Sequence, residues 1–452
     1  MKLLLENLGV VKKIDLDLSK RLLVFCGPNG TGKTYVSYAV YGYLTSPLFS
    51  VDLFNLQELL EKKELNVAID YPLIDRLTLL NLESLRYTIS YIFGLHDKNY
   101  FHDFKASISK DRESMKKKFF SFTHDYDNCV ITYTKENSNL HIRLDETEQT
   151  GLADVSVVSE PTAIYQNSRM RRMHRTHNAI IGKYLCNDSL LNAYILPVER
   201  NSVYTFADNL AVNKIKELSV ENDNDRYPLP VQDALATAID LRHIKRQTSP
   251  YSNLAEEIEN EILLGKIAVS EDGEIQFKPG NAGNIVLPVH LSASIIKNLS
   301  GLLIYLKHQA KENDLLIIDE PELGLHPDNQ IRLARIFGKL INNGIRLLIN
   351  THSDYILREL NNLIMLSSVG RSTKNKMKAW GYSDDEAIKN EFVGAYLFDT
   401  DKDAPGSVTV ESLAVEKNGF EVKTIDAAIN RLNQVSEDIY YYMRYESEER
   451  LA

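Results

Sequence analysis

Residues 27–34 read GPNGTGKT, a glycine-rich pattern that ends in a lysine and a threonine. The apolar run 22–25 precedes it, and residues 35–40 can continue as a helix. In a strand–loop–helix setting, glycines let successive backbone N–H groups point at phosphate oxygens, and the helix N-terminus adds its positive dipole end. We predict a phosphate-binding loop whose contacting residues are Asn29, Gly30, Thr31, Gly32, Lys33 and Thr34. Lys33 would reach the β- and γ-phosphates, and the Thr34 hydroxyl would ligate Mg²⁺.

A second acidic motif lies far along the chain, where residues 315–320 read LLIIDE. Four apolar residues followed by two acids indicate a buried parallel strand with carboxylates at its C-terminal end, where open α/β sheets bind ligands. We predict that Asp319 holds Mg²⁺ and that Glu320 is catalytic, as a general base or a water-orienting group. The alternative for both acids is plain solvation of a strand end.

Two smaller motifs accompany these. Residues 290–294 read HLSAS and precede an apolar helical stretch, so Ser292 lies where a cap and an anion-binding helix N-terminus are expected. Residues 346–350 form another apolar strand, which ends in the sequence THSD. We predict that His352 hydrogen-bonds the γ-phosphate or its attacking water, as a second catalytic residue. Taken singly, His352 could be an ordinary polar cap and Ser292 only an N-cap.

The set GPNGTGKT, LSAS, LLIIDEPELGLHP and INTHSD resembles the ABC-type ATPase heads, in particular the soluble branch with the SMC, RecF and OLD-nuclease ATPases. It is also similar to the small ATPases of bacterial phage-defence operons, such as those of the PARIS and Septu systems and some retrons. Matching segments cover about residues 1–45, 190–205 and 260–368. One departure is the signature segment, where LSAS replaces the Leu-Ser-Gly-Gly of transporters.

The resemblance implies an α/β fold: an ABC-type P-loop ATPase head with a mixed, largely parallel sheet, an antiparallel β subdomain and a helical lobe. It also implies ATP and Mg²⁺ as ligands and a site completed by a second head, in a homodimer or higher homo-oligomer. The second head would contact the nucleotide through Ser292, Ala293 and Ser294. The function implied is that of an ATPase sensor or scaffold in an antiviral defence complex, with a separate effector nuclease or toxin. The alternatives are a DNA repair or recombination ATPase of the RecF or SMC kind, and a stand-alone nuclease.

Composition limits the class of protein. The chain has 452 residues, a net charge of −10 and three scattered cysteines. Neither a membrane-spanning stretch nor a signal peptide is evident, so we expect a cytoplasmic protein without a disulfide framework or a zinc hook. The acidic balance disfavours a protein that coats DNA generally.

The motifs also divide the chain. We expect an ATPase core lobe with the phosphate-binding loop, a helical and β insertion, a helical lobe with the signature segment, a second core segment, and a C-terminal hairpin and helix. The expected ranges are, in that order, 1–50 with 191–204, 51–190, 205–310, 311–368 and 369–452. ABC-type heads carry a glutamine at the strand end near residue 197, and here only Glu199 or Arg200 is available to replace it, or to join the lobes by a salt bridge.

Further segments are notable for their charged residues or for the spacing of their apolar residues. Basic runs lie at residues 110–118 and 169–177, and the second could bind nucleic acid through Arg169, Arg171, Arg172 and Arg175 or simply be a solvated face. Asp399 and Asp401 could suggest a nuclease metal site, but we expect a polar hairpin tip there. Residues 424–444 are expected to form a helix that packs on the core or on a neighbouring subunit, with one apolar face made of Ile425, Ile429, Leu432, Ile439 and Met443.

Overall fold

The computed structural model describes residues 1–45, 53–97, 99–109, 119–126, 129–146, 181–182, 185, 192–205, 227–280, 285–401 and 404–449. The chain divides into two compact units. The first comprises residues 1–5, 15–19 and 38–193. The second comprises residues 6–14, 20–37 and 194–452, and it contains every predicted site residue that the structure describes. Both basic runs lie outside the described residues.

The largest sheet has nine strands in the order β5-β1-β2-β16-β15-β3-β14-β13-β9. Their bounds are β1 Lys2–Leu8, β2 Val11–Asp17, β3 Leu22–Cys26, β5 Lys105–Ser109, β9 Ala193–Leu196, β13 Leu315–Asp319, β14 Arg346–Asn350, β15 Val393–Thr400 and β16 Val408–Leu413. Every residue of β3 and β13 is buried, as expected for strands covered on both faces.

The pairing of the central strands brings the residues of the site together. Strand β14 pairs in parallel with both β13 and β3, and β15 pairs in parallel with the other side of β3. Asp319 on β13 lies opposite Asn350 on β14, which lies opposite Phe25 on β3. The C-terminal ends of three strands therefore meet at one edge of the sheet, directly where the predicted phosphate-binding loop begins.

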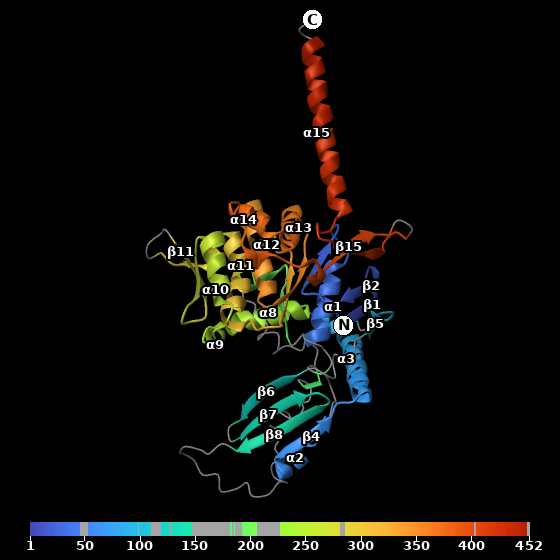
Figure 1. The fold of residues 1–452 in the computed structure, drawn as a ribbon, viewed down its shortest axis with the longest axis vertical. Helices are drawn as coiled ribbons and strands as arrows, with labels where there is room; N and C mark the ends of the chain where they lie inside the picture. The colour runs from blue at the N-terminus through green and yellow to red at the C-terminus, as the bar shows by residue number, and fades with distance from the viewer. Residues whose placement is uncertain are drawn as a thin grey trace. The chain divides into compact units, whose positions relative to one another are not determined.

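Helices of the second unit pack together beside this sheet, with α10, α11, α12 and α13 grouped in Figure 1. Their bounds, with those of shorter helices, are α1 Lys33–Thr45, α8 Leu229–Ile239, α9 Leu241–Ile244, α10 Ser252–Ile258, η1 Glu259–Leu263, η2 Val289–Leu291, α11 Ser294–Ile304, η3 Tyr305–Gln309, α12 Pro327–Asn342, α13 Asp354–Ser368, α14 Arg371–Lys378, η4 Asp384–Glu386 and η5 Asn390–Phe392. Apolar side chains of these helices and of the central strands form one continuous core.

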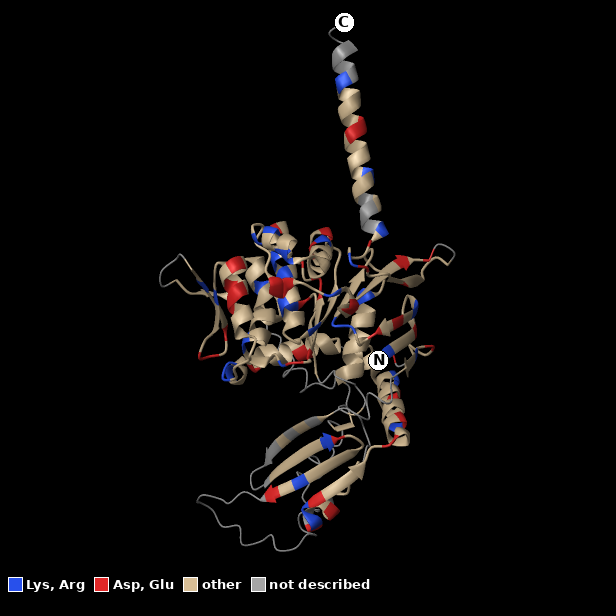
Figure 2. Ribbon diagram, viewed as in Figure 1, with Lys and Arg blue, Asp and Glu red and all other residues tan. Residues whose placement is uncertain are grey.

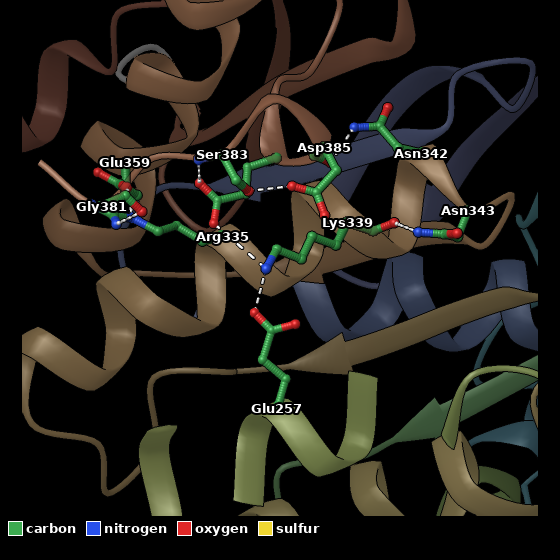
Figure 3. A network of polar contacts seen from close by, with 10 residues as sticks. Glu257, Arg335, Lys339, Asn342, Asn343, Glu359, Gly381, Ser383 and Asp385 are labelled. Carbon is green, nitrogen blue, oxygen red and sulfur yellow. Dashed lines mark hydrogen bonds and ion pairs between the residues drawn. The ribbon is translucent and has the colours of Figure 1, made fainter. Parts of the chain in front are cut away.

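A polar network fastens α12 to its neighbours (Figure 3). Arg335 donates to the Glu359 carboxylate on α13 at 2.6 Å, and its guanidinium lies over the Tyr382 ring. One turn further on, Lys339 forms an ion pair with Glu257 on α10 and another, at 3.7 Å, with Glu386. Two cations of one helix thus bind three other segments, which fixes how α12 is placed.

The remaining sheets are small. Strands β10 Gly265–Val269, β11 Ile275–Pro279 and β12 Leu287–Pro288 form an antiparallel sheet in the second unit. In the first unit, β4 Glu64–Ala68, β6 Phe120–Tyr126, β7 Cys129–Glu136 and β8 Asn139–Glu146 form an antiparallel sheet in the order β4-β8-β7-β6. Helices α2 Leu56–Lys62 and α3 Tyr71–Ile92 belong to the same unit, which has its own apolar core.

The predicted fold class is confirmed: the protein is a mixed α/β structure with a largely parallel central sheet and a separate antiparallel sheet. Residues 51–120 contain the strands β4 and β5 as well as the helices α2 and α3. The described residues contain no helix long and apolar enough to cross a membrane.

The last helix, α15 Lys423–Glu449, covers the predicted helical stretch. Of the two expected partners, the core and a neighbouring subunit, the core does not cover residues 430–444, because each of their side chains is exposed. Long uncharged stretches of this helix are visible as tan ribbon in Figure 2.

Candidate functional site

The phosphate-binding loop joins β3 to α1. At Gly27, with φ +133°, a Cβ atom would stand 2.0 Å from the carbonyl oxygen of Phe398, so only glycine fits. Gly30 and Gly32 have φ values of +74° and +82°, which also favour glycine. The backbone therefore winds as the sequence predicts, and α1 begins at Lys33 with its N-terminus at the loop.

Lys33 is buried, and its ammonium group lies beside the residues that begin the loop. Its Nζ donates to the carbonyl oxygens of Gly27 at 3.0 Å and Pro28 at 2.8 Å. Burial lowers the pKa of Lys33 from 10.5 to about 8, although the nearby Asp319 carboxylate raises it. The lysine thus lies inside the curve of the loop, where a bound phosphate would be its natural partner.

The second motif meets the first through one contact. Thr34 Oγ1 donates to Asp319 Oδ2 at 2.8 Å, across 285 positions of sequence. Asn350 Nδ2 donates to the other carboxylate oxygen at 2.9 Å, and Ser37 Oγ donates to Asn350 Oδ1 at 2.9 Å. Burial raises the pKa of Asp319, while the hydrogen bonds from Asn350 and Thr34 lower it. The carboxylate is therefore fixed in orientation by three other side chains, two of which bind it directly.

These oxygens fit a magnesium ion. Mg²⁺ prefers oxygen ligands, and proteins usually bind it through one or two carboxylates or hydroxyls together with substrate phosphates. Thr34 and Asp319 supply such a pair at the mouth of the phosphate loop. Within the described residues, no group of three or more His, Cys, Asp and Glu side chains is placed to hold a metal.

Glu320 follows Asp319 in an uncommon backbone conformation, with φ +49°. Such a value is sterically unfavourable for a residue with a Cβ and is found disproportionately at functional sites. The backbone N–H of Glu320 donates to the Asn350 carbonyl at 3.0 Å, and its side chain is half-buried. The Glu320 carboxylate lies near Lys33 of the phosphate loop, and its charge raises the pKa of that lysine.

Arg200 holds this turn in place. Its Nη1 donates to the Asp319 carbonyl oxygen at 2.6 Å, and its Nη2 donates to the Glu320 carbonyl oxygen at 2.7 Å. Its other donors reach the carbonyl oxygens of Pro197 at 3.0 Å and Asn298 at 3.2 Å. The guanidinium is 2% exposed, so these four acceptors replace water completely. Of the two candidates for the missing glutamine, the structure places Arg200 between the segments, bound to backbone rather than in a salt bridge.

His352 also lies at the loop. Burial lowers its pKa, as does the charge of Lys33, while a hydrogen bond with the backbone of Gly27 raises it. Its own backbone N–H donates to Glu322 Oε1 at 2.6 Å, and Thr351 Oγ1 donates to Glu322 Oε2 at 2.9 Å. His352 is thus placed beside the phosphate loop by a half-buried acid, Glu322, that the sequence reading did not single out.

The signature residues occupy the start of α11. Ser292 is buried and its hydroxyl donates to the Pro288 carbonyl at 3.2 Å, whereas Ala293 and Ser294 are exposed. Ala293 is the N-cap and makes no side-chain cap, so the end of an 11-residue helix faces outward with its donors uncapped by side chains. Asn298 donates to the Leu323 carbonyl at 2.9 Å, which ties α11 to the loop after Glu320.

The remaining predicted residues lie on the loop, outside the described residues, or at the β15–β16 pair. Asn29 and Gly30 are exposed on the loop, and Thr31 Oγ1 donates to the Pro28 carbonyl at 2.8 Å. Arg169, Arg171, Arg172 and Arg175 lie outside the described residues. Asp399 lies on β15, and Asp401 forms an ion pair with Lys12 at 2.6 Å. The β15–β16 pair is antiparallel, as a hairpin requires.

A phosphate loop, a buried acid beside its threonine and a second acid at the strand end define a P-loop nucleotide-hydrolase site. The chain belongs to the AAA ATPase domain family, which it matches over residues 1–357. That match confirms the predicted class of P-loop ATPase.

Curated relatives match only in part. Over 216 residues the chain is 25% identical to UvrABC system protein A of Mycoplasmopsis pulmonis, covering 47% of this chain and 20% of that protein. Over 110 residues it is 30% identical to UvrABC system protein A of Staphylococcus aureus strain COL, covering 24% of this chain and 10% of that protein. The chain thus spans a fifth or less of the length of these relatives.

Solved structures of similar outline include an Smc head bound to the C-terminal winged-helix domain of ScpA and the SMC head domain of Thermotoga maritima. The first has a TM-score of 0.36 and 14% identity, and covers 92% of this chain and 98% of that one. The second has a TM-score of 0.32 and 11% identity, with the same coverage of 92% and 98%. Scores this low add nothing to the family assignment.

Replacing Arg200 by lysine is expected to destabilise the protein by about 2–4 kcal/mol, because one ammonium group cannot reach four carbonyl oxygens and leaves buried acceptors unpaired. Urea unfolding measures the loss. Arg246→Lys, at an exposed arginine, is the matched control and should change the unfolding free energy by less than about 0.5 kcal/mol. Equal stability of the two variants would show that the four contacts of Arg200 are not needed.

The pKa of Lys33 predicts a pH dependence of ATP affinity. Phosphate charges favour the ammonium form, so above a pH of about 8 binding must take up a proton, and affinity should fall by up to about tenfold per pH unit. Below that pH Lys33 is already charged and contributes no slope. Calorimetric titration from pH 7 to 9.5 measures the trend. Lys33→Arg keeps its charge throughout and should lose the slope; a flat profile for the parent protein would contradict the prediction.

Proposed function

We propose that the protein binds ATP with Mg²⁺ and hydrolyses it to ADP and phosphate, in sites that two copies of the chain complete. The observation that carries the proposal is the contact of Thr34 with Asp319 at 2.8 Å. It brings the phosphate-binding loop and the acidic strand end into one site, with Asn350 holding the acid from behind. The AAA ATPase domain family supports the same activity.

Each residue then has a physical task. Backbone N–H groups of the loop and the Lys33 ammonium bind the phosphates and compensate their charge. Thr34 and Asp319 would hold Mg²⁺, which when bound shields the β- and γ-phosphate oxygens. Glu320 accepts the hydrogen bond of the attacking water and orients it towards the γ-phosphorus, and His352 binds the phosphate oxygen or the same water. The water oxygen bonds to the γ-phosphorus as the bond from that phosphorus to the β–γ bridging oxygen breaks. The water gives up a proton, and the products are ADP and phosphate.

A second copy would supply the remaining contacts. The N-terminus of α11 is exposed at Ala293 and Ser294, and an uncapped helix end is a natural anion site. We infer that this end of one copy binds the γ-phosphate held by the loop of the other, which gives two identical sites related by a two-fold axis. Asn298 and Arg200 link the same helix to the carbonyl oxygens at and after Glu320. When two copies come together at this helix, the movement would therefore be transmitted to Glu320, which orients the water.

For the biological role, we propose a sensor or scaffold subunit of a cytoplasmic antiviral defence complex that controls a separate effector nuclease or toxin. The involvement of Asp401 in an ion pair with Lys12 supports a structural hairpin there rather than a nuclease site in this chain. A DNA repair or recombination ATPase of the RecF or SMC kind is the alternative. Affinity purification of the tagged Glu320→Gln protein with ATP separates the two: an effector protein in stoichiometric amount supports the first, and DNA without such a protein supports the second.

Replacement of Glu320 by glutamine should keep ATP binding and slow turnover by about 10²–10⁴-fold, because the amide keeps the shape but cannot act as the anionic acceptor. Phosphate release and equilibrium ATP binding are the two measurements. Glu391→Gln, at an exposed acid, is the control and should turn over normally. Normal turnover in the Glu320 variant would remove this residue from the mechanism.

The two-copy site predicts complementation. Ser292→Arg and Lys33→Ala should each hydrolyse ATP at a small fraction of the parental rate, since one lacks the helix end and the other the loop lysine. In an equal mixture about half of the pairs are mixed, each with one complete site, so about a quarter of the parental rate should return. Failure of the mixture to recover activity, or normal activity of Ser292→Arg alone, would contradict completion of the site by a second copy.

A further inference from the structure

Helix α15 carries an apolar stripe that nothing in the described residues covers. Leu432, Val435, Ile439 and Tyr442 are 65%, 49%, 55% and 71% exposed. Their spacing of three, four and three residues places them on one side of the helix, within about a third of its circumference. Single exposed apolar side chains are ordinary, but a continuous stripe of this length marks an interaction surface.

The spacing itself describes the surface. Three-four spacing is the a and d pattern of helices that pack side by side with knobs in holes, and such a seam is complementary to a copy of itself. The described helix continues past the stripe for several residues, which leaves room for a partner helix along it. We propose that α15 pairs with α15 of a second copy of this chain, antiparallel and without need of nucleotide.

Charge fixes the direction and the register. Arg431 and Asp438 lie seven residues apart on the same flank of the stripe, and both side chains are exposed. In an antiparallel pair that sets Leu432 against Val435 of the partner subunit, these equivalent flanks face each other. Arg431 of each copy then lies beside Asp438 of the partner subunit, so one two-fold axis creates two attractive pairs.

Other arrangements lose these pairs. Shifting the antiparallel register by one heptad brings Asp438 against its own copy, which is repulsive. In a parallel pair, Arg431 and Asp438 of one copy face the other flank of the partner helix. At those levels that flank holds Ser436 and Met443, which carry no charge. Only the first arrangement satisfies the apolar stripe and both charges together.

This contact would be separate from the nucleotide-dependent one. The proposed sandwich uses α11 and the phosphate loop, whereas α15 contributes no residue to that site. Association through α15 is therefore measured on the full-length protein in the absence of nucleotide, and its outcome is independent of whether ATP is hydrolysed.

Sedimentation equilibrium of the nucleotide-free protein tests the proposal. The parent protein should dimerise with rising concentration. Asp438→Arg should weaken the dimer by about tenfold, because two attractions become two repulsions. Glu437→Arg makes the same change of charge one residue away, on a side of the helix that faces away from the stripe, and should leave the dissociation constant unchanged. The double variant Arg431→Glu with Asp438→Arg exchanges the charges and should restore the dimer.

A final pair of variants tests the stripe. Leu432→Asp with Ile439→Asp should leave a monomer at every concentration, and because both positions are exposed, the thermal unfolding of the rest of the protein should not change. A parent protein that stays monomeric, an aspartate variant that dimerises normally, or a charge exchange that fails to restore the dimer would each overturn the proposal.

Discussion

The contact between Thr34 and the buried carboxylate of Asp319 is the interaction on which the site depends. A carboxylate in a buried position is costly unless its oxygens accept hydrogen bonds. Here one oxygen accepts from Thr34 and the other from Asn350, and Ser37 in turn binds Asn350. The same bonds that make burial acceptable also fix the acid beside the loop, so the stability of the fold and the geometry of the proposed metal site have one cause.

The turn at Glu320 shows how an unfavourable conformation is maintained. A φ of +49° at a residue with a side chain costs on the order of 1 kcal/mol. Arg200 offsets that cost by binding the carbonyl oxygens on both sides of the turn. Since the guanidinium also binds the Asn298 carbonyl of α11, the strained turn and the helical lobe share one support. A displacement of α11 therefore acts directly on the backbone of Glu320.

The central fold could be predicted because its signals are local. The glycine-rich loop, the apolar strand before Asp319 and the helix after Ser292 each depend on a few adjacent residues. Asn350 could have been found from the same logic, since it ends an apolar strand next to His352. Glu322 could not, and Arg200 was only one of two candidates beside Glu199, because the contacts of both residues are made with segments distant in sequence. Strands β4 and β5 are short and their flanking sequences favour helix, so a local pattern does not predict them.

The strand before the phosphate loop ends in a cysteine, and its surroundings decide its chemistry. Cys26 is fully buried, its thiol donates to the Tyr396 carbonyl at 3.4 Å, and burial raises its pKa to about 12. Alkylating agents and peroxides attack the thiolate, which at this pKa is almost absent at neutral pH. Oxidative or electrophilic stress therefore does not reach the phosphate loop through its own adjoining sulfur, and cysteine-directed reagents leave this position unlabelled while the protein is folded.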